Sequence, residues 1–247
     1  VSARFADKQS ARRAVWDRLQ AERLAVFPFP PHGRIPNFKG AREAARRLFT
    51  LPPWRDARAI KVNPDSPQAA VREEALRRGI AVYVPTPRLA GGFRRLDPAR
   101  IPSDRFAEAA ERANWDRFAE EVPLDALPHF DAIVVGSVAV TRDGRRAGKG
   151  AGYADLEYAI LRELGHPPAP VATTVHGVQI VEDFPATAND LPLSAIATPE
   201  ETVIVARPPP APAGVQWERI GPDELAAMPV LRELLTRRPP SAVPPRR

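Results

Sequence analysis

Short apolar segments alternate with helical ones along most of this 247-residue chain, and this alternation restricts the fold more than any other feature. The stretch from 58 to 85 shows it most clearly. A short strand is expected at 58–62, followed by a helix that Ser66 caps and Gly79 ends, and then by the strand Ile-Ala-Val-Tyr-Val at 80–84. Two strands joined by a helix in this way form a βαβ unit with parallel strands. The alternation predicts an α/β fold, a three-layer sandwich with a largely parallel central sheet.

The remaining elements extend this pattern. Besides the helix at 66–79, helices are expected at 7–26, where Asp7 is the N-cap, and at 41–49, 104–112, 154–164 and 223–237. Further strands are expected at 132–135, 170–176 and 202–206, with a short continuation at 178–181 and an edge strand at 216–220. The polar chain between 112 and 128 is expected to be irregular.

The chain is expected to form one domain with a short appendage. Residues 1–206 are the α/β domain, 207–238 are a Pro-rich spacer plus a C-terminal helix that packs on the same domain, and 239–247 are a disordered tail. Hydrophobic residues make up 44% of the chain, which is enough for a buried core. A monomer is expected, because no heptad pattern or long apolar edge is evident.

The composition excludes several kinds of chemistry. The chain has no cysteine, so it has no disulfide, thiolate nucleophile or cysteine-based zinc site, and none of its four histidines has a partner at metal-binding spacing. No apolar run approaches the roughly 20 residues of a membrane-spanning helix, and the charged N-terminus does not match a signal peptide. A cytoplasmic protein without a membrane partner is therefore expected. The net charge of +6 favours anionic ligands and leaves nucleic acid open, without specific support.

The most distinctive stretch runs from 144 to 155, with the sequence Gly-Arg-Arg-Ala-Gly-Lys-Gly-Ala-Gly-Tyr-Ala-Asp. Four glycines fall within nine residues, and three cations lie among them. Glycines allow backbone N–H groups to turn inward, and the expected helix N-terminus adds partial positive charge, so the combination indicates a phosphate-binding loop. A flexible surface turn is the alternative. The spacing matches neither a Walker A loop, in which Gly150 would have to be Ser or Thr, nor the dinucleotide-binding fingerprint.

This stretch resembles the G-x-R-L-G-x-G-x-G-Y-Y-D signature of the 5-formyltetrahydrofolate cyclo-ligase family, whose members are also called methenyltetrahydrofolate synthetases. Lys8 and Arg12 are similar to the family's N-terminal K-x-x-x-R, and Asn189 and Asp190 to its late H-D pair. The resemblance implies the cyclo-ligase (NagB/RpiA-like) type of α/β sandwich. Segments that resemble a narrower branch, the methenyltetrahydrofolate synthase domain-containing proteins, lie at 34–40, 84–89, 136–140 and 148–158. Animal members of that branch carry an additional RNA-recognition domain, which is not expected here.

The resemblance implies an ATP- and Mg²⁺-dependent reaction on a small-molecule substrate. In the family, the formyl oxygen of 5-formyltetrahydrofolate attacks the γ-phosphate of ATP, and the folate N10 then closes the ring to give 5,10-methenyltetrahydrofolate as phosphate leaves. Carried over by position, Arg146 and Lys149 are the expected catalytic residues. Asp155 and Asp190 are the expected Mg²⁺ ligands, although Asp155 is also placed to stabilise a helix N-terminus. The residues expected to bind ATP are Lys8, Arg12, Arg146, Ala147, Gly148, Lys149, Gly150, Ala151, Gly152 and Tyr153.

Three departures from the family pattern concern the substrate. Ala154 stands where a second tyrosine is usual, and Leu156 where many members have arginine. Asp65 lies in a loop where most members carry a pterin-binding glutamate. Lys39 and Arg88 belong to segments of the narrower branch and are expected either to line the substrate pocket or to lie on the surface. The main expectation is therefore a cyclo-ligase. The alternatives are a paralogue with another cofactor-related substrate, with thiamine metabolism as one direction, and a non-catalytic nucleotide- or RNA-binding module.

Overall fold

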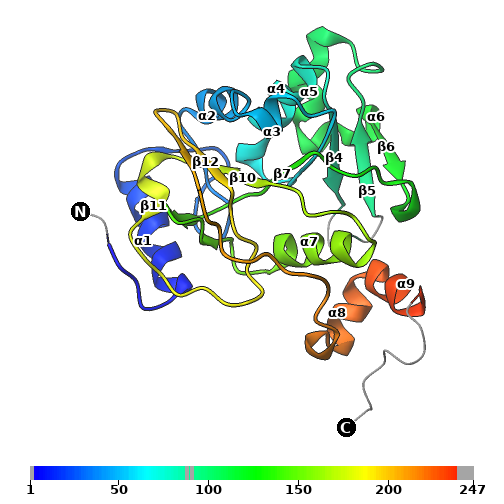
Figure 1. The fold of residues 1–247 in the computed structure, drawn as a ribbon. Helices are drawn as coiled ribbons and strands as arrows, with labels where there is room; N and C mark the ends of the chain where they lie inside the picture. The colour runs from blue at the N-terminus through cyan, green and yellow to red at the C-terminus, as the bar shows by residue number, and fades with distance from the viewer. Residues whose placement is uncertain (1–2, 87–88, 90–91, 238–247) are drawn as a thin grey trace.

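The computed structural model describes residues 3–86, 89 and 92–237, and its centre is an eight-stranded sheet (Figure 1). From edge to edge, the strands are β13 (Thr202–Ile204), β12 (Ala195–Ala197), β10 (Val171–Thr174), β7 (Ala132–Val134), β3 (Ala59–Val62), β4 (Ala81–Pro85), β5 (Phe93–Leu96) and β6 (Ala119–Val122). The five strands from β12 to β4 are parallel, whereas β13, β5 and β6 at the two edges each pair with the preceding strand in antiparallel fashion. The predicted α/β fold with a largely parallel sheet is confirmed.

Neighbouring side chains of the central strands pack against different layers of helices. In β4, Val82 and Val84 belong to the apolar cluster on one face, and Tyr83 to the cluster on the other. The first face is covered by α2 (Ala41–Leu48), α3 (Pro52–Arg55), α4 (Ala69–Arg77), α5 (Phe106–Ala110) and α6 (Trp115–Phe118). The second is covered by α7 (Tyr153–Glu163), α8 (Pro222–Ala227) and α9 (Pro229–Arg237). The two-residue repeat of a strand thus produces the predicted three layers (Figure 1).

A smaller sheet lies against the first helix of the chain. It contains, in order, β11 (Ile180–Val181), β8 (Ala139–Thr141) and β9 (Arg146–Ala147). Helix α1 (Lys8–Ala21) packs on it through Ala11 and Leu19. Asp7 caps this helix as predicted, because its carboxylate accepts the Ser10 amide at 2.7 Å. The short strands β1 (Ala25–Val26) and β2 (Asn37–Phe38) pair with each other after α1.

The edge strands β5 and β6 are not predicted by the sequence pattern, since β5 contains two arginines and the chain after it is polar. In the structure, Arg94 and Arg95 of β5 lie opposite Glu121 and Glu120 of β6, and the Arg95–Glu120 ion pair measures 2.9 Å. Cross-strand pairs of opposite charge stabilise an antiparallel edge without an apolar repeat. The expectation of irregular chain between 112 and 128 is wrong for this reason.

The C-terminal segment also differs from the prediction. Residues 217–219 form a 3₁₀ turn instead of an edge strand, and the helix expected at 223–237 is divided at Met228 into α8 and α9. Pro229 has no N–H group to continue α8, and a proline is well suited to the first position of a new helix. Met228 and Leu231 are buried in the same apolar cluster as α7, so this segment covers part of the second face.

Three smaller boundaries shift as well. Helix α1 ends at Ala21, and residues 25–26 pair as β1 instead of continuing the helix. Ser66 begins a 3₁₀ turn before α4, and residues 180–181 join the smaller sheet instead of the central one.

In the part of the chain that the structure describes, no helix is both long and apolar enough to cross a bilayer. The expected tail at 239–247 lies outside the described residues.

Candidate functional site

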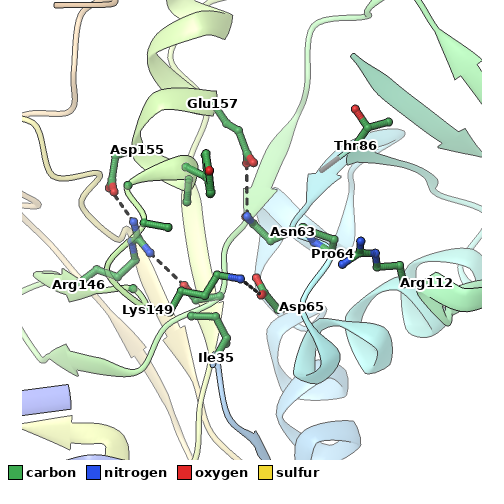
Figure 2. Close-up of a pocket in the computed structure, with 16 residues that line it drawn as sticks. Ile35, Asn63, Pro64, Asp65, Thr86, Arg112, Arg146, Lys149, Asp155 and Glu157 are labelled. Atoms are coloured by element: carbon green, nitrogen blue, oxygen red, sulfur yellow. Dashed lines mark hydrogen bonds and ion pairs between the residues drawn. The ribbon is translucent and has the colours of Figure 1, made fainter. Parts of the chain in front are cut away.

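A cavity of about 190 Å³ opens at the carboxyl edge of the parallel strands (Figure 2). From β3 the chain continues to β4 on one side, whereas β7 and β10 lie on the other side, so the strand order reverses between β3 and β7. Asn63 follows β3, Thr86 follows β4 and Gly136 comes shortly after β7, and all three line the cavity. In open α/β sheets, such a reversal leaves a crevice beyond the strand ends, which is the usual place for a ligand.

The glycine-rich stretch is not one continuous loop, which corrects the sequence interpretation. Gly144 ends a tight turn in which its amide donates to Thr141 O at 3.0 Å. Arg146 and Ala147 then form β9, and only residues 148–152 form a loop, which leads directly into α7. The small sheet requires this division, because β9 pairs with β8 in the middle of the stretch. The phosphate-loop hypothesis therefore narrows to 148–152.

The three cations of the stretch point in different directions. Arg145 forms ion pairs with Asp143, at 2.9 Å, and with Asp183, on the side away from the cavity. Arg146 and Lys149 both line the cavity. Neighbouring side chains of an extended backbone point to opposite sides, so Arg145 and Arg146 could not both face the ligand. Two of the three cations therefore remain candidates for ligand binding.

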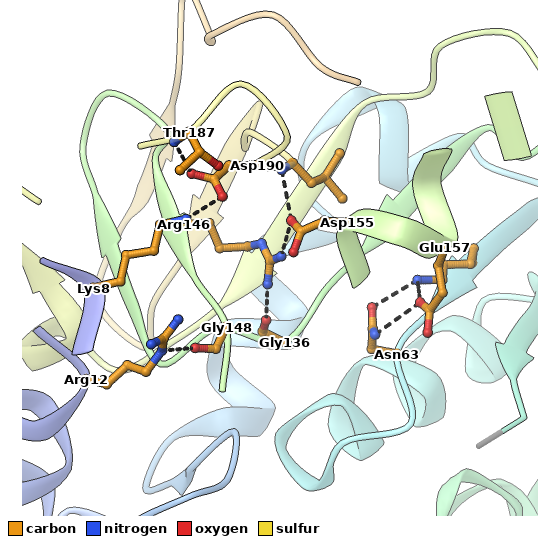
Figure 3. A network of polar contacts seen from close by, with 12 residues as sticks. Lys8, Arg12, Asn63, Gly136, Arg146, Gly148, Asp155, Glu157, Thr187 and Asp190 are labelled. Atoms are coloured by element: carbon orange, nitrogen blue, oxygen red, sulfur yellow. Dashed lines mark hydrogen bonds and ion pairs between the residues drawn. The ribbon is translucent and has the colours of Figure 1, made fainter. Parts of the chain in front are cut away.

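Two guanidinium groups flank the 148–152 loop. Arg12 Nε of α1 donates to Gly148 O at 2.6 Å (Figure 3). Arg146, which is only 4% exposed, lies so close to the loop that a Cβ added to Gly148 would be 2.9 Å from its Nη1. Burial, and next the charge of Arg146, lower the pKa of Arg12. The two charges repel each other, and an anion between them would relieve this repulsion.

The guanidinium of Arg146 ties several parts of the site together. Its Nη1 donates to Gly136 O at 3.0 Å, and its Nη2 donates to Asp155 Oδ1 at 2.6 Å in the first turn of α7. The same carboxylate oxygen accepts Leu191 N at 2.9 Å. The planar fork of an arginine suits two acceptors at once, whereas an ammonium group is a single point charge. Arg146 and Asp155 thus fix the start of α7 to the end of β7 and to the chain at Leu191.

A second ion pair lies beyond Asp155, between Lys8 of α1 and Asp190. The carboxylate of Asp190 also accepts the Thr187 amide at 2.6 Å (Figure 3). Asp155 and Asp190 line a second cavity, of about 450 Å³, together with residues of the Pro-rich segment and α8. Both cavities are lined by 151–153 and Asp155, so the loop and the start of α7 separate them.

Lys149 reaches across the first cavity to the loop after β3, where its Nζ donates to Asp65 Oδ1 at 3.1 Å (Figure 2). The lysine side chain is 42% exposed, so this ion pair contributes at most about 1 kcal/mol. The loop itself is anchored by Arg72, which is buried and donates to Asn63 O at 2.7 Å and to Asp65 O at 3.3 Å. Burial lowers the pKa of Arg72 to about 10. Asp65 therefore lies on an anchored loop, whereas Lys149 is held mainly by one weak pair.

Three buried polar side chains, of which Asn63 and Glu157 line this cavity and Lys61 lies behind them, are not singled out by the sequence pattern. Lys61 of β3 and Glu157 of α7 form an ion pair with side chains that are 1% and 7% exposed. Asn63 contacts both, with 3.1 Å from Lys61 Nζ to its Oδ1 and 3.3 Å from its Nδ2 to Glu157 Oε2. Burial raises the pKa of Glu157, and the charge of Lys61 opposes this shift. The available signal was a lysine inside an apolar strand, since such a charge needs a buried partner.

The structure brings most of the predicted site residues together. Those that line at least one of the two cavities are Asp65, Arg146, Gly148, Lys149, Ala151, Gly152, Tyr153, Asp155 and Asp190. Lys8 and Arg12 contact this group, Gly150 lies beside Arg12, and Ala147 is buried in β9. Lys39 lies elsewhere, at a separate cavity of about 340 Å³. Arg88 lies outside the described residues.

The donor set at Asp155 and Asp190 fits a Mg²⁺ ion that is shared with a phosphate ligand. Carboxylate oxygens suit Mg²⁺, which proteins usually bind through one or two carboxylates together with phosphate oxygens and water. Arg146 and Leu191 both contact Oδ1 of Asp155, and Oδ2 accepts no hydrogen bond from the described residues. Across residues 3–86, 89 and 92–237, no three His, Asp or Glu side chains converge on one metal position. A metal ion at Asp155 and Asp190 would therefore need further oxygen ligands from a bound phosphate compound or from water.

Fold and site together define a class: an α/β protein with a cationic, glycine-rich loop beside a cavity at the switch point of its sheet. The comparison with known families is more specific. The model of the 5-formyltetrahydrofolate cyclo-ligase family matches residues 4–199, and the chain belongs to this family. Members of the family are ATP-dependent ligases. The recognition that the glycine-rich signature suggested is thereby confirmed.

Several known proteins are similar to this chain. The methenyltetrahydrofolate synthase domain-containing protein of Mus musculus is 41% identical over 237 residues, which cover 93% of this chain and 63% of that protein. Its Homo sapiens counterpart is 36% identical, with 93% and 62% covered. The chain thus spans about three fifths of the length of these relatives. A 5-formyltetrahydrofolate cyclo-ligase of Mycolicibacterium smegmatis is 26% identical over 132 residues, which cover 53% of this chain and 60% of that protein.

A solved structure supports the fold. The NMR structure of Aquifex aeolicus 5,10-methenyltetrahydrofolate synthetase aligns with a TM-score of 0.51, covering 81% of this chain and 93% of that chain. The sequence identity is 17%, so the likeness concerns the arrangement of strands and helices alone. It agrees with the three-layer α/β sandwich that the alternating sequence pattern predicts.

Proposed function

We propose that this chain is an ATP- and Mg²⁺-dependent enzyme of the cyclo-ligase type that converts 5-formyltetrahydrofolate into 5,10-methenyltetrahydrofolate. The observation that carries the proposal is the convergence of three cations on the 148–152 loop: Arg12 from α1, Arg146 from β9, and Lys149 from the loop itself. Lys8 of α1 adds a fourth positive charge at Asp190, which lines the neighbouring cavity. In this proposal, the triphosphate lies along the loop. The N-terminus of α7 adds backbone N–H groups and a partial positive charge to the same place.

The residues present suit a phosphoryl transfer without a protein nucleophile. As the formyl oxygen attacks the γ-phosphate, Arg146 and Lys149 stabilise the negative charge on the transferred group. Arg146 is already oriented by Gly136 and Asp155, so it needs little reorganisation. Lys149 must exchange Asp65 for the phosphate, which costs little because the lysine side chain is 42% exposed. A Mg²⁺ ion held by Asp155 and Asp190 would supply further positive charge at the phosphate oxygens.

A second candidate is a paralogue that acts on another cofactor-related metabolite, and the substrate side of the cavity supports it. Ala154 lines the cavity at the position where the family pattern has a second tyrosine, so an aromatic surface for stacking is missing at that point. Asp65, at the place of the family's pterin-binding glutamate, forms an ion pair with Lys149. Both differences change what a pterin ring could contact.

The test is a turnover assay with the full chain, 5-formyltetrahydrofolate and Mg-ATP, followed by the absorbance of the methenyl product. Product formation that requires both ATP and Mg²⁺ supports the first candidate. Normal Mg-ATP binding without turnover contradicts it and supports the second. Failure of the protein to bind Mg-ATP contradicts both, because both place the triphosphate on the 148–152 loop.

A further inference from the structure

The Lys61–Asn63–Glu157 cluster at the first cavity is not used by the proposed phosphate chemistry, although it carries two buried charges. Lys61, Asn63 and Glu157 are all buried. A buried ion pair adds little net stability, because removing two charges from water costs about as much as their attraction returns. Stability alone therefore does not explain why Lys61 of β3 holds a charged Glu157 of α7 at the wall of a cavity.

Both hydrogen bonds that the cluster makes to Glu157 go to the same oxygen of its carboxylate. Lys61 Nζ and Asn63 Nδ2 both donate to Oε2 of Glu157. Oε1 of Glu157 accepts no hydrogen bond from the residues that the structure describes, and both Glu157 and Asn63 line the cavity (Figure 2). The carboxylate is thus fixed through one oxygen and retains the other as an acceptor. A rigidly held acceptor at a cavity wall suits the recognition of an N–H donor.

The neighbouring position on α7 leaves room for a flat ligand. Ala154 precedes Glu157 by three residues, so the two side chains lie on the same face of the helix, and both line the cavity. The small side chain of Ala154 does not occupy the space beside the carboxylate. Lys61 of β3 and Asn63, which directly follows β3, both hold the carboxylate, so the acceptor on α7 is fixed to the central sheet.

We propose that Glu157 is a specificity-determining residue for the second substrate, and that its Oε1 accepts the N–H donors of a planar heterocycle bearing an exocyclic amino group. Lys61 and Asn63 are positioning residues, which hold the carboxylate in place and act through it. This inference rests on the proposed cyclo-ligase function, in which the pterin ring of the folate carries such an amino group. It assigns the recognition of that ring to α7, whereas Asp65 is paired with Lys149.

The first test removes the carboxylate without leaving a buried charge. The double variant Lys61→Met/Glu157→Gln replaces both charged groups by neutral ones of similar size, and circular dichroism and thermal unfolding check its fold. We expect 5-formyltetrahydrofolate to bind at least about tenfold more weakly, as for the loss of a hydrogen bond to a charged group. Mg-ATP should bind within twofold of the wild type. The control variant Arg94→Met/Glu121→Gln removes a surface pair on β5 and β6 and should change neither affinity.

The second test uses the wild-type protein and does not depend on how a variant folds. Pterin and lumazine are nearly identical in shape, but lumazine has a carbonyl oxygen in place of the amino group. Wild-type protein should bind pterin at least about tenfold more tightly, because a carbonyl oxygen facing the carboxylate leaves both acceptors without a donor. The folded double variant should lose this preference, which a purely structural role for Glu157 would not affect.

The outcomes separate this inference from the proposed function. Equal binding of pterin and lumazine by the wild type, or an unchanged preference in the double variant, overturns the role of Glu157. If the wild type nevertheless forms the methenyl product, the cyclo-ligase function stands and only this inference fails. If the wild type does not bind Mg-ATP, the proposed function fails, and the pterin preference still decides whether Glu157 recognises an amino-bearing ring.

Discussion

The backbone at Gly152 offers a direct test of the phosphate loop. Gly152 is the N-cap of α7 with φ +68°, and an added Cβ would meet no atom within 4 Å. Gly152→Ala therefore causes no clash, and its cost is the left-handed conformation alone, about 1–2 kcal/mol, offset by about 0.4–1 kcal/mol from the stiffer unfolded chain. In the Gly152→Ala variant, the free 148–152 loop can relax and release about 1 kcal/mol of backbone strain. Binding of Mg-ATP must then restore the strained conformation, at the same cost in free energy. Mg-ATP affinity should then fall about fivefold.

Gly165→Ala is the matched control. Gly165 follows α7 with φ +85°, and an added Cβ would again meet nothing within 4 Å, so the loss of stability should be similar. Guanidinium chloride unfolding measures the stability of both variants, and titration calorimetry measures their affinity for Mg-ATP. We expect comparable losses of unfolding free energy and weaker Mg-ATP binding in Gly152→Ala alone. Equal affinities in the two variants would refute the reasoning, because the conformation at 152 would then have no part in phosphate binding.

Three further predictions concern single side chains. Lys149→Met should weaken Mg-ATP binding at least about tenfold in calorimetry. The control Arg145→Met removes a cation that points away from the cavity and should change the affinity less than threefold. Equal effects of the two substitutions would contradict the loop geometry. Arg146→Lys keeps the charge but cannot reach both acceptors, so guanidinium chloride unfolding should show a loss of about 1.5–3 kcal/mol, and an unchanged free energy would contradict this. Burial, and next the charge of His129, lower the pKa of His166. Below about pH 6.5, His166 takes up a proton in the unfolded chain more readily than in the folded chain. The free energy of unfolding should therefore fall from pH 7.5 to 5.5, by at most about 1.4 kcal/mol per pH unit. His166→Phe should flatten this dependence, and an unchanged slope would count against it.

The fold was largely predictable because its signals are local. The strand at 80–84 is a short apolar run, the strand at 58–62 carries Ile60 and Val62, and both appear in the structure with shifts of one residue. The edge strands β5 and β6 were missed because the charges of Arg94 and Arg95 interrupt the apolar pattern of β5. The opposite charges on β6 that pair with them lie beside them only in the folded chain. Pro229 marks the break between α8 and α9 in the sequence. The break was not predicted, because the apolar residues before and after Pro229 continue a single helical pattern.

The candidate site was predictable in its residue types and only partly in its geometry. The glycines and cations of 144–155 indicated an anion site, and the match to the cyclo-ligase family confirms the recognition on which their roles were proposed. The sequence could not show that β9 interrupts the stretch, since a two-residue strand has no periodicity of its own. Nor could it show that Lys39 lines a different cavity. Both facts depend on pairing and packing between distant segments.

The sequence by itself therefore determined the alternation of strands and helices and the family, because these depend on residue type and spacing along the chain. The tertiary structure decided which charges meet. Lys149 contacts Asp65, 84 residues away, and Lys61 contacts Glu157, 96 residues away. Lys61 lies in β3, and Asp65 in the loop after it. The 148–152 loop and α7 come later in the chain than β7, which pairs with β3 in the sheet. Neighbours in a sheet are fixed by hydrogen bonding and burial, so only the folded chain shows which acceptors remain for a substrate.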